Sequence, residues 1–291
     1  MKQRVHLVIE GEVVLGDLFL PATPGPHPAV VVAGPMTSVK EQVTGVYACA
    51  LATRGIAALS IDPRHFGESG GSPRQYEHFE HKIADLKASL RWLAEQPNID
   101  RGRLGFAGIC LGAGYAMWAA VDNPLVQTVG AVAGYYRHPS ELRAKDPDGF
   151  DAKVNAGKAA REHYEATGEA VVVPAVALEG DAAMTLAETF DYYGTRRAAV
   201  PNYVNAFAVM SREHFLGFDV QAAASRVRAS VFMVHSENAL SPAWARRFHD
   251  HLEVEKRIEW IASKGQVDFY DDPALVAKSC DLLAKHALGQ G

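Results

Sequence analysis

The chain has 291 residues, of which 48% are hydrophobic and 22% charged, the usual balance of a soluble globular protein. Its 29 Lys and Arg against 34 Asp and Glu give a net charge of −5, so we expect neither nucleic acid nor a membrane as partner. No apolar run approaches the roughly 20 residues of a membrane span, and no signal-peptide core follows the N-terminus. Three scattered cysteines and no metal-spaced or nucleotide-binding motif predict a reducing cytoplasm, no metal and no cofactor.

The first 21 residues alternate between apolar and polar side chains, as in an antiparallel pair of strands. Short β-branched runs then alternate with segments of helical periodicity. This order predicts an α/β protein with a mainly parallel sheet and helices on both faces. The predicted strands span residues 29–33, 56–61, 104–109, 129–132, 231–234 and 258–261. The predicted helices span residues 42–54, 81–96, 112–121, 242–252 and 273–287.

Residues 138–205 interrupt this alternation with helical patches around 153–166 and 182–193. Functional groups of a parallel sheet gather at the carboxyl ends of its strands, so we predict that this insertion forms a helical lid over them. The chain then divides into a first core part (1–137), the lid (138–205) and a second core part (206–291). An ordinary surface charge favours a monomer or a homodimer.

The most informative motif is a Gly-x-Cys-x-Gly sequence around Cys110, with an apolar strand before it and a helix after it. This is the nucleophile-elbow pattern with Cys in place of Ser, and Gly108 and Gly112 make room for the sharp turn. A cysteine at a helix N-terminus is favoured as thiolate, so we expect Cys110 to be a nucleophile of low pKa. A buried structural cysteine is the competing interpretation.

A second element is the loop that begins Gly34-Pro35-Met36 after the first parallel strand. With an elbow present, such a loop supplies one backbone N–H to an oxyanion hole, and the residue after the nucleophile supplies the other. We therefore predict Met36 and Leu111 as the two donors. Two such donors stabilise a developing oxyanion by several kcal/mol. Nearby, Asp62, Arg64 and Glu68 are expected to brace this loop through an internal ion pair.

Several stretches together resemble the α/β-hydrolase superfamily, in its dienelactone-hydrolase-like branch, and within it the fungal thiohydrolases and polyketide transferases. The resemblance covers nearly the whole chain and implies an α/β-hydrolase fold and acyl chemistry on an ester, lactone or thioester of specialised, polyketide-like metabolism. The substrate it implies is a small molecule, either free or as a carrier-bound acyl thioester. The stretches are Gly34–Gln42, Asp62–Arg74, Gly108–Cys110, Asp191–Tyr193 with Pro201-Asn202, and His235–Ala239.

The sequence departs from the family at the other two triad positions, which should follow the nucleophile in the order acid, histidine. Ala239 stands where most relatives carry Asp, and Glu237 is the only carboxylate in that turn. Gln266 stands where the family has His. Since glutamine accepts no proton near neutral pH, the general base of the standard mechanism is missing.

Three explanations remain open for the missing base. Another histidine, His65 or His214, is a candidate base, although each is also compatible with simple packing. A thiolate that is already formed needs no base for attack. The site is also compatible with a non-hydrolytic cyclase, isomerase or lyase reaction, or with ligand binding alone.

Three tyrosines are candidate substrate-contacting residues. Tyr135 and Tyr136 follow a predicted strand directly, and Tyr193 lies in the predicted lid. Core packing is an equally good interpretation of each.

Overall fold

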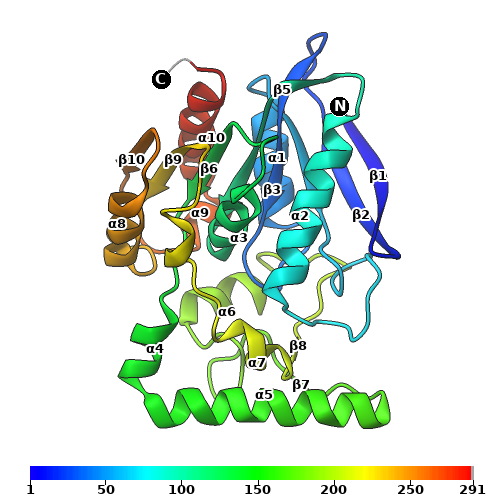
Figure 1. Ribbon diagram of the computed structural model, residues 1–291, viewed down its shortest axis with the longest axis vertical. Coiled ribbons are helices and arrows are strands. Elements are labelled where there is room, and N and C mark those ends of the chain that lie inside the picture. The colour runs from blue at the N-terminus through cyan, green and yellow to red at the C-terminus, as the bar shows by residue number, and fades with distance from the viewer. Residues whose placement is uncertain (290–291) are drawn as a thin grey trace.

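The centre of the molecule is an eight-stranded sheet with the strand order β1-β2-β4-β3-β5-β6-β9-β10 (Figure 1). The computed structural model describes residues 1–289. Strand β2 runs antiparallel to β1 and β4, and the remaining neighbours run parallel. The strands of this sheet are β1 (Lys2–Ile9), β2 (Glu12–Phe19), β3 (His27–Ala33), β4 (Ala57–Ile61), β5 (Ile99–Ile109), β6 (Thr128–Val132), β9 (Ser230–His235) and β10 (Lys256–Trp260).

Helices cover both faces of the sheet. Helices α1 and α10 pack against each other on one face, while α2 and α3 lie together on the other, with α8 beside them (Figure 1). The predicted mainly parallel α/β architecture is therefore confirmed. The helices of this core are α1 (Val43–Ala52), α2 (Phe79–Ala94), α3 (Leu111–Ala120), α8 (Pro242–His251), α9 (Asp268–Asp271) and α10 (Pro273–Ala287).

The burial of the central strands explains their apolar sequences. Every residue of β3 and of β4 is buried, because helices cover both faces of the sheet there. Strand β5 begins five residues earlier than the predicted strand at residues 104–109. Its first half contains Asp100 and three exposed residues after it, so hydrophobic periodicity gave no signal there.

The segment between β6 and β9 forms a separate layer at the carboxyl ends of the parallel strands, at the bottom of Figure 1. The long helix α5 crosses this layer, and the strand pair β7–β8 joins residues 172–173 to residues 207–208. This pairing carries the layer past residue 205, and the division at residues 137 and 205 stays a prediction. The elements are α4 (Pro139–Lys145), α5 (Pro147–Thr167), β7 (Val172–Val173), α6 (Ala187–Tyr193), β8 (Phe207–Ala208), α7 (Ser211–Phe215) and the 3₁₀ turn η1 (Gln221–Ala223).

The topology brings the candidate residues to one edge of the sheet. The loops after β3, β4, β5, β6 and β9 all begin at the carboxyl ends of neighbouring parallel strands. They carry Met36, Asp62, Cys110, Tyr135 and Glu237 respectively. Within residues 1–289, none of the helices combines the length and the apolar character that a membrane span requires.

Candidate active site

Cys110 occupies a strained turn between β5 and α3. Its backbone has φ +56° and ψ −125°, in the left-handed half of the map that side-chain-bearing residues rarely adopt. A Cβ on Gly108 would lie 2.5 Å from the Cα of Ala113, and one on Gly112 would lie 2.1 Å from the carbonyl oxygen of Ala33. Only glycine fits at these two positions, so the predicted elbow geometry is present.

The Cys110 thiol is not the low-pKa group that we expected. The residue is 7% exposed, and burial raises the pKa of the thiol. The Tyr270 hydroxyl, the Leu111 N–H and the Gln266 side chain act in the opposite direction, but they do not outweigh burial. The expectation of a preformed thiolate was therefore wrong, because loss of solvation exceeds the stabilisation at the helix N-terminus.

Gln266 lies against Cys110 and is completely buried. Its Oε1 accepts a hydrogen bond from the Leu240 N–H at 3.0 Å, and its Nε2 donates to the Ala133 carbonyl at 2.8 Å. Leu240 directly follows Ala239, so the side chain ties the turn where relatives carry the acid to the loop after β6. The amide thus fills the position expected for histidine and is held by backbone groups.

The structure does not bring Glu237 to Gln266. The Glu237 side chain is 62% exposed and forms an ion pair with Arg246 on α8. Its carboxylate therefore points to solvent, because the Arg246 guanidinium holds it at the surface. A role for Glu237 as the acid of a triad has no support in this geometry.

The two alternative histidines contact other groups as well. Nδ1 of His65 lies 3.0 Å from the Pro73 carbonyl oxygen, and its Nε2 lies 2.9 Å from Nδ1 of His81. Burial lowers the pKa of His65 to about 4, with the neighbouring His81 as a second cause. His214 is exposed, and its ring centroid lies 4.8 Å from that of His78. These four histidines form a cluster of their own, so neither candidate is placed as a base for Cys110.

The three candidate tyrosines have different environments. Tyr135 is half-buried beside the nucleophile, and its N–H donates to the Cys110 carbonyl at 2.9 Å. Tyr193 is buried on α6, and the nearby Cys110 contributes to raising its pKa after burial and Tyr192. Tyr136 instead stacks on Phe248 in the core, with ring centroids 4.5 Å apart. The structure therefore places Tyr136 in the packing interior and not at the nucleophile.

Two residues at the site were missed by the sequence interpretation. Tyr270 on α9 is 1% exposed, and its hydroxyl interacts with both Cys110 and Gln266. Burial raises its pKa well above the ordinary value, so the phenol is neutral and keeps its proton. Glu188 on the lid helix α6 accepts the Gln266 N–H at 2.8 Å. The motif around Gln266 already contained Tyr270, whereas nothing local pointed to Glu188.

The loop with the predicted oxyanion donor Met36 is fixed by a buried carboxylate. Glu77 accepts the Thr37 N–H at 2.8 Å and the Tyr115 hydroxyl at 2.6 Å, and it pairs with Lys82 at 2.6 Å. Thr37 has φ +61°, so this anchor holds a strained backbone next to Met36. Met36 precedes this anchored residue and Leu111 directly follows Cys110, and the assignment of their N–H groups to an oxyanion hole stays a prediction.

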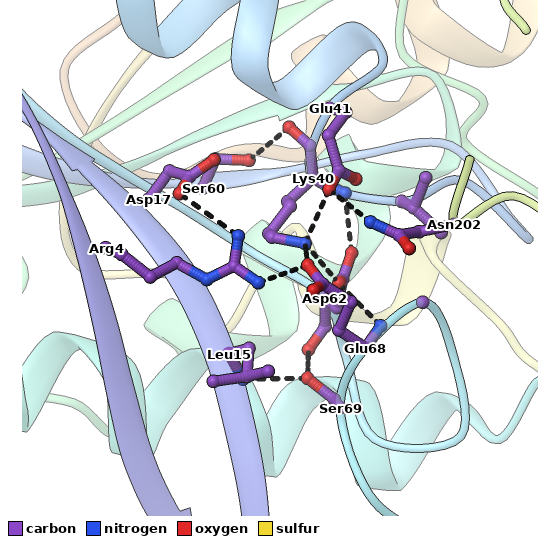
Figure 2. Close-up of polar contacts among 12 residues, drawn as sticks. Arg4, Leu15, Asp17, Lys40, Glu41, Ser60, Asp62, Glu68, Ser69 and Asn202 are labelled. Carbon is purple, nitrogen blue, oxygen red and sulfur yellow. Dashed lines mark hydrogen bonds and ion pairs between the residues drawn. The ribbon is translucent and has the colours of Figure 1, made fainter. Parts of the chain in front are cut away.

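A second network, centred on the buried Lys40, holds the far end of the same loop (Figure 2). Nζ of Lys40 lies 2.7 Å from Glu41, 2.7 Å from Asp62 and 2.5 Å from Glu68. Burial alone would lower the pKa of Lys40, but hydrogen bonds with these carboxylates raise it, so the ammonium is charged. Asn202 from the lid donates to Glu41 at 2.8 Å.

The expected ion-pair brace thus exists, but with other partners. Asp62 and Glu68 pair with Lys40, while Arg64 pairs with Asp85. The oxygens of Glu41, Asp62 and Glu68 lie close enough together to resemble a cation site. The Lys40 ammonium already supplies the cation that these three carboxylates require, so we assign the cluster a structural role.

With this geometry in place, comparison with known proteins identifies the family. Residues 10–238 match the model of the X-Pro dipeptidyl-peptidase (S15) family. The chain belongs to this family. The matched region includes the loop after β3 with Met36, the elbow at Cys110 and all of the predicted lid at residues 138–205, and it ends before Gln266.

Relatives of this S15-family chain include proteins of several named types. The uncharacterized protein YcjY of Escherichia coli is 29% identical over 267 residues, which cover 89% of this chain and 87% of that protein. A thiohydrolase of Eupenicillium brefeldianum is 25% identical over 271 residues, 89% of this chain and 85% of its own. The thiohydrolase aneE of Aspergillus aculeatus is 34% identical over 126 residues, 43% of this chain and 39% of its own.

Solved structures show the same fold. Protein PA2218 of Pseudomonas aeruginosa has a TM-score of 0.82 at 25% identity and covers 100% of this chain and 94% of its own. The α/β hydrolase GrgF of a Penicillium species has a TM-score of 0.80 at 21% identity, and a dienelactone hydrolase of Anabaena variabilis has 0.61 at 14%. Each covers 99% of this chain, with 99% and 97% of their own lengths. The predicted α/β-hydrolase fold is confirmed, and this S15-family chain is a hydrolase-type enzyme.

Proposed function

We propose that this enzyme transfers acyl groups through Cys110, taking them from thioesters, esters or lactones of polyketide-like specialised metabolism. The observation that carries the proposal is the cysteine at the elbow, with its thiol against Tyr270 and Gln266 at the carboxyl edge of the sheet. The relatives named thiohydrolases support the choice of acyl donor. The substrate we infer is a small molecule, either free or bound to an acyl carrier.

The first step is attack by the sulfur of Cys110 on the acyl carbonyl. The S–C bond forms, the carbonyl electrons move onto oxygen opposite the Met36 and Leu111 N–H groups, and collapse breaks the bond to the leaving group. The thiol proton must end on that leaving group. Tyr270 touches the thiol and is neutral, so its hydroxyl can accept this proton while it passes its own to the leaving atom.

The missing histidine favours a thioester as acyl donor. A leaving thiol has a pKa of about 8.5, close to that of a cysteine, so it can take the proton without a strong base. An alcohol is a much weaker acid, and its departure depends more heavily on a positioned acid. Deacylation by water also needs a base, and the backbone-bonded Gln266 amide cannot act as one. We therefore expect a long-lived acyl-enzyme and transfer to an acceptor in preference to hydrolysis.

The same feature favours a second candidate function. A site with an oxyanion hole and no base also suits a cyclase, in which a hydroxyl or amine of the acyl chain displaces Cys110 and hydrolysis is avoided. The two candidates share the acyl-enzyme and differ only in the acceptor.

Trapping the acyl-enzyme tests both candidates. The protein would be incubated with the butyryl thioester of N-acetylcysteamine and analysed by intact mass and peptide mapping. We expect one butyryl group on Cys110, none in Cys110→Ala, and normal labelling in the control Cys49→Ala, whose cysteine is exposed on α1. Turnover that survives Cys110→Ala, or an acyl group on Cys49 alone, would exclude Cys110 as nucleophile.

A further inference from the structure

Three buried hydroxyl groups around the active site have no hydrogen-bond partner. They are Oγ1 of Thr37 and the phenolic oxygens of Tyr193 and Tyr203. We call them the hydroxyl trio. Thr37 belongs to the oxyanion loop, Tyr193 to the lid helix α6, and Tyr203 to the lid segment that follows it.

The hydroxyl trio gathers next to the nucleophile. The rings of Tyr193 and Tyr203 stack with centroids 5.5 Å apart, and Tyr193 lies 6.4 Å from Tyr270, which touches the Cys110 thiol. Thr37 is the residue after the predicted oxyanion donor Met36, and its hydroxyl lies close enough to that of Tyr203 to lower the pKa of the phenol, although the two do not reach hydrogen-bond geometry. The trio therefore combines a residue of the predicted oxyanion loop with two tyrosines from the segment between β6 and β9, of which Tyr193 lies near Cys110.

Leaving these hydroxyls unpaired is costly for the empty protein. A buried polar group without a partner costs about 1–3 kcal/mol, and most buried groups in native proteins avoid this cost. The backbone of the same residue is satisfied, since Glu77 accepts the N–H of Thr37. The missing partner of the Thr37 hydroxyl is therefore not a general feature of this loop. Three orphaned hydroxyls in one place thus indicate a group that arrives with the substrate.

The charges nearby indicate which kind of group this is. The buried cations that flank the oxyanion loop, Lys40 and Lys82, are already paired with Asp62 and Glu77. A carboxylate in this place would find both of these lysines already paired, and burying it without one of them would be expensive. A neutral oxygen suits three hydroxyls, because each of them can both donate and accept.

We infer that the hydroxyl trio binds a neutral hydroxyl or keto oxygen on the acyl chain, close to the reacting carbonyl. This inference rests on the proposed acyl transfer through Cys110 and names the class of acyl donor that the site selects. An acyl chain without that oxygen would leave the three hydroxyls unpaired in the complex, whereas an oxygenated chain would satisfy them.

The kinetic test compares two acyl donors that differ by one oxygen, the 3-hydroxybutyryl and butyryl thioesters of N-acetylcysteamine. We expect the wild type to prefer the hydroxylated donor in kcat/KM, and we expect Tyr193→Phe and Tyr203→Phe each to lower this preference about 5- to 30-fold. The melting temperature of both variants should stay the same or rise, because an orphaned hydroxyl has been removed.

Tyr136→Phe is the matched control. Tyr136 also has a buried, unpaired hydroxyl, but it packs on Phe248 in the core. Its removal should leave the preference between the two donors unchanged. An equal fall in preference for Tyr136→Phe, or no fall for either lid variant, would overturn the inference.

A binding measurement separates this inference from the proposed function. Amide analogues of the two thioesters cannot be cleaved easily, and their affinity for Cys110→Ala is measured by calorimetry. Tighter binding of the hydroxylated analogue, lost in the Tyr193→Phe background, supports the hydroxyl trio even if no acyl-enzyme ever forms. Equal affinity of the two analogues overturns the inference, whatever the acylation of Cys110 shows.

Discussion

The two ends of the oxyanion loop differ in how their buried polar groups are satisfied. At Lys40, the ammonium contacts three carboxylates and both oxygens of Asp62 accept hydrogen bonds, so that Oε2 of Glu41 is left without a partner while the charged groups themselves are paired. At Thr37, three residues earlier, the side-chain hydroxyl has no partner, and neither do the two lid tyrosines beside it. Lys40, Asp62 and the three hydroxyl oxygens are all buried, so exposure to solvent does not explain the difference between these groups.

This contrast distinguishes buried polar groups that stabilise the fold from buried polar groups that bind a ligand. A satisfied buried network rigidifies the chain, and losing one member leaves the others unpaired. An unsatisfied one destabilises the empty protein and gains its partners only from a ligand. The Lys40 network therefore fixes the loop, whereas the hydroxyl trio and the amide of Gln266 define what the loop acts on.

The largest effect should come from restoring a base and its acid. Gln266→His alone lacks an orienting carboxylate, because Glu237 points to solvent and Ala239 occupies the usual position of the acid. The double variant Gln266→His with Ala239→Asp should raise hydrolysis of a simple thioester by about 10²–10⁴-fold, the usual contribution of a positioned general base. Steady-state hydrolysis is measured, and the rise must vanish when Cys110→Ala is added. Hydrolysis unchanged in a folded double variant would contradict the assignment of Gln266 to the histidine position.

Removing the cation from the satisfied network should destabilise the fold strongly. Lys40→Met leaves Glu41, Asp62 and Glu68 without their shared ammonium, so the free energy of unfolding should fall by about 3–5 kcal/mol. Urea denaturation measures this loss. Arg143→Gln serves as control, since it breaks an exposed pair with Asp151 and should cost no more than about 1 kcal/mol. A cost below that of the control would show that the network does not hold the loop.

The raised pKa of Cys110 predicts which thiol reacts first with iodoacetamide. A thiol is reactive as thiolate, and a pKa raised by burial keeps Cys110 protonated at pH 7. Exposed Cys49 should be alkylated at least about ten times faster, and labelling of Cys110 should increase as pH rises toward its pKa. Cys280, whose pKa burial raises to about 12, should stay unmodified throughout. Peptide mapping over a pH series measures the labelling of each cysteine. If Cys110 were labelled faster than Cys49 at pH 7, the thiol of Cys110 would be a thiolate in the free protein.

The smallest effect is expected at the contact between the lid and the Lys40 network. Asn202→Ala removes one hydrogen bond to Glu41, worth about 0.5–1.5 kcal/mol. Amide hydrogen exchange in the segment around residues 198–203 should become faster while the sheet is unaffected. Unchanged exchange there would mean that the satisfied network ends at Glu41 and does not hold the lid.

Much of the fold was predictable because the spacing of apolar residues within each segment indicates a strand or a helix. Buried parallel strands are continuous apolar runs, and the predicted strands and core helices agree with the structure to within a few residues, apart from the start of β5. The helices α4, α7 and the four-residue α9 were missed. They are short, and their 7, 5 and 4 residues carry too few apolar positions for a periodic signal.

The part of the site that could be predicted is the elbow, where only glycine avoids a steric clash. Gly108 and Gly112 identify the elbow at Cys110 because any side chain at either position would collide with backbone. The motif around Gln266 likewise predicted its place beside the nucleophile, which the structure shows. Glu237, His65 and Tyr136 were chosen only because they have suitable side chains and follow a predicted strand. Nothing in their sequence context fixes the direction of the side chain.

The residues of each segment were thus enough to predict the strands and the elbow, and the family resemblance was enough to predict a glutamine in place of histidine at position 266. Only the tertiary structure decided where the side chains of Glu237 and His65 point, because Arg246 and His81 reach them from other elements. The tertiary structure also determines that the Cys110 thiol is protonated and that the hydroxyl trio has no hydrogen-bond partners. Solvation and hydrogen-bond satisfaction are sums over every segment that packs around a group, and no single stretch of sequence contains them.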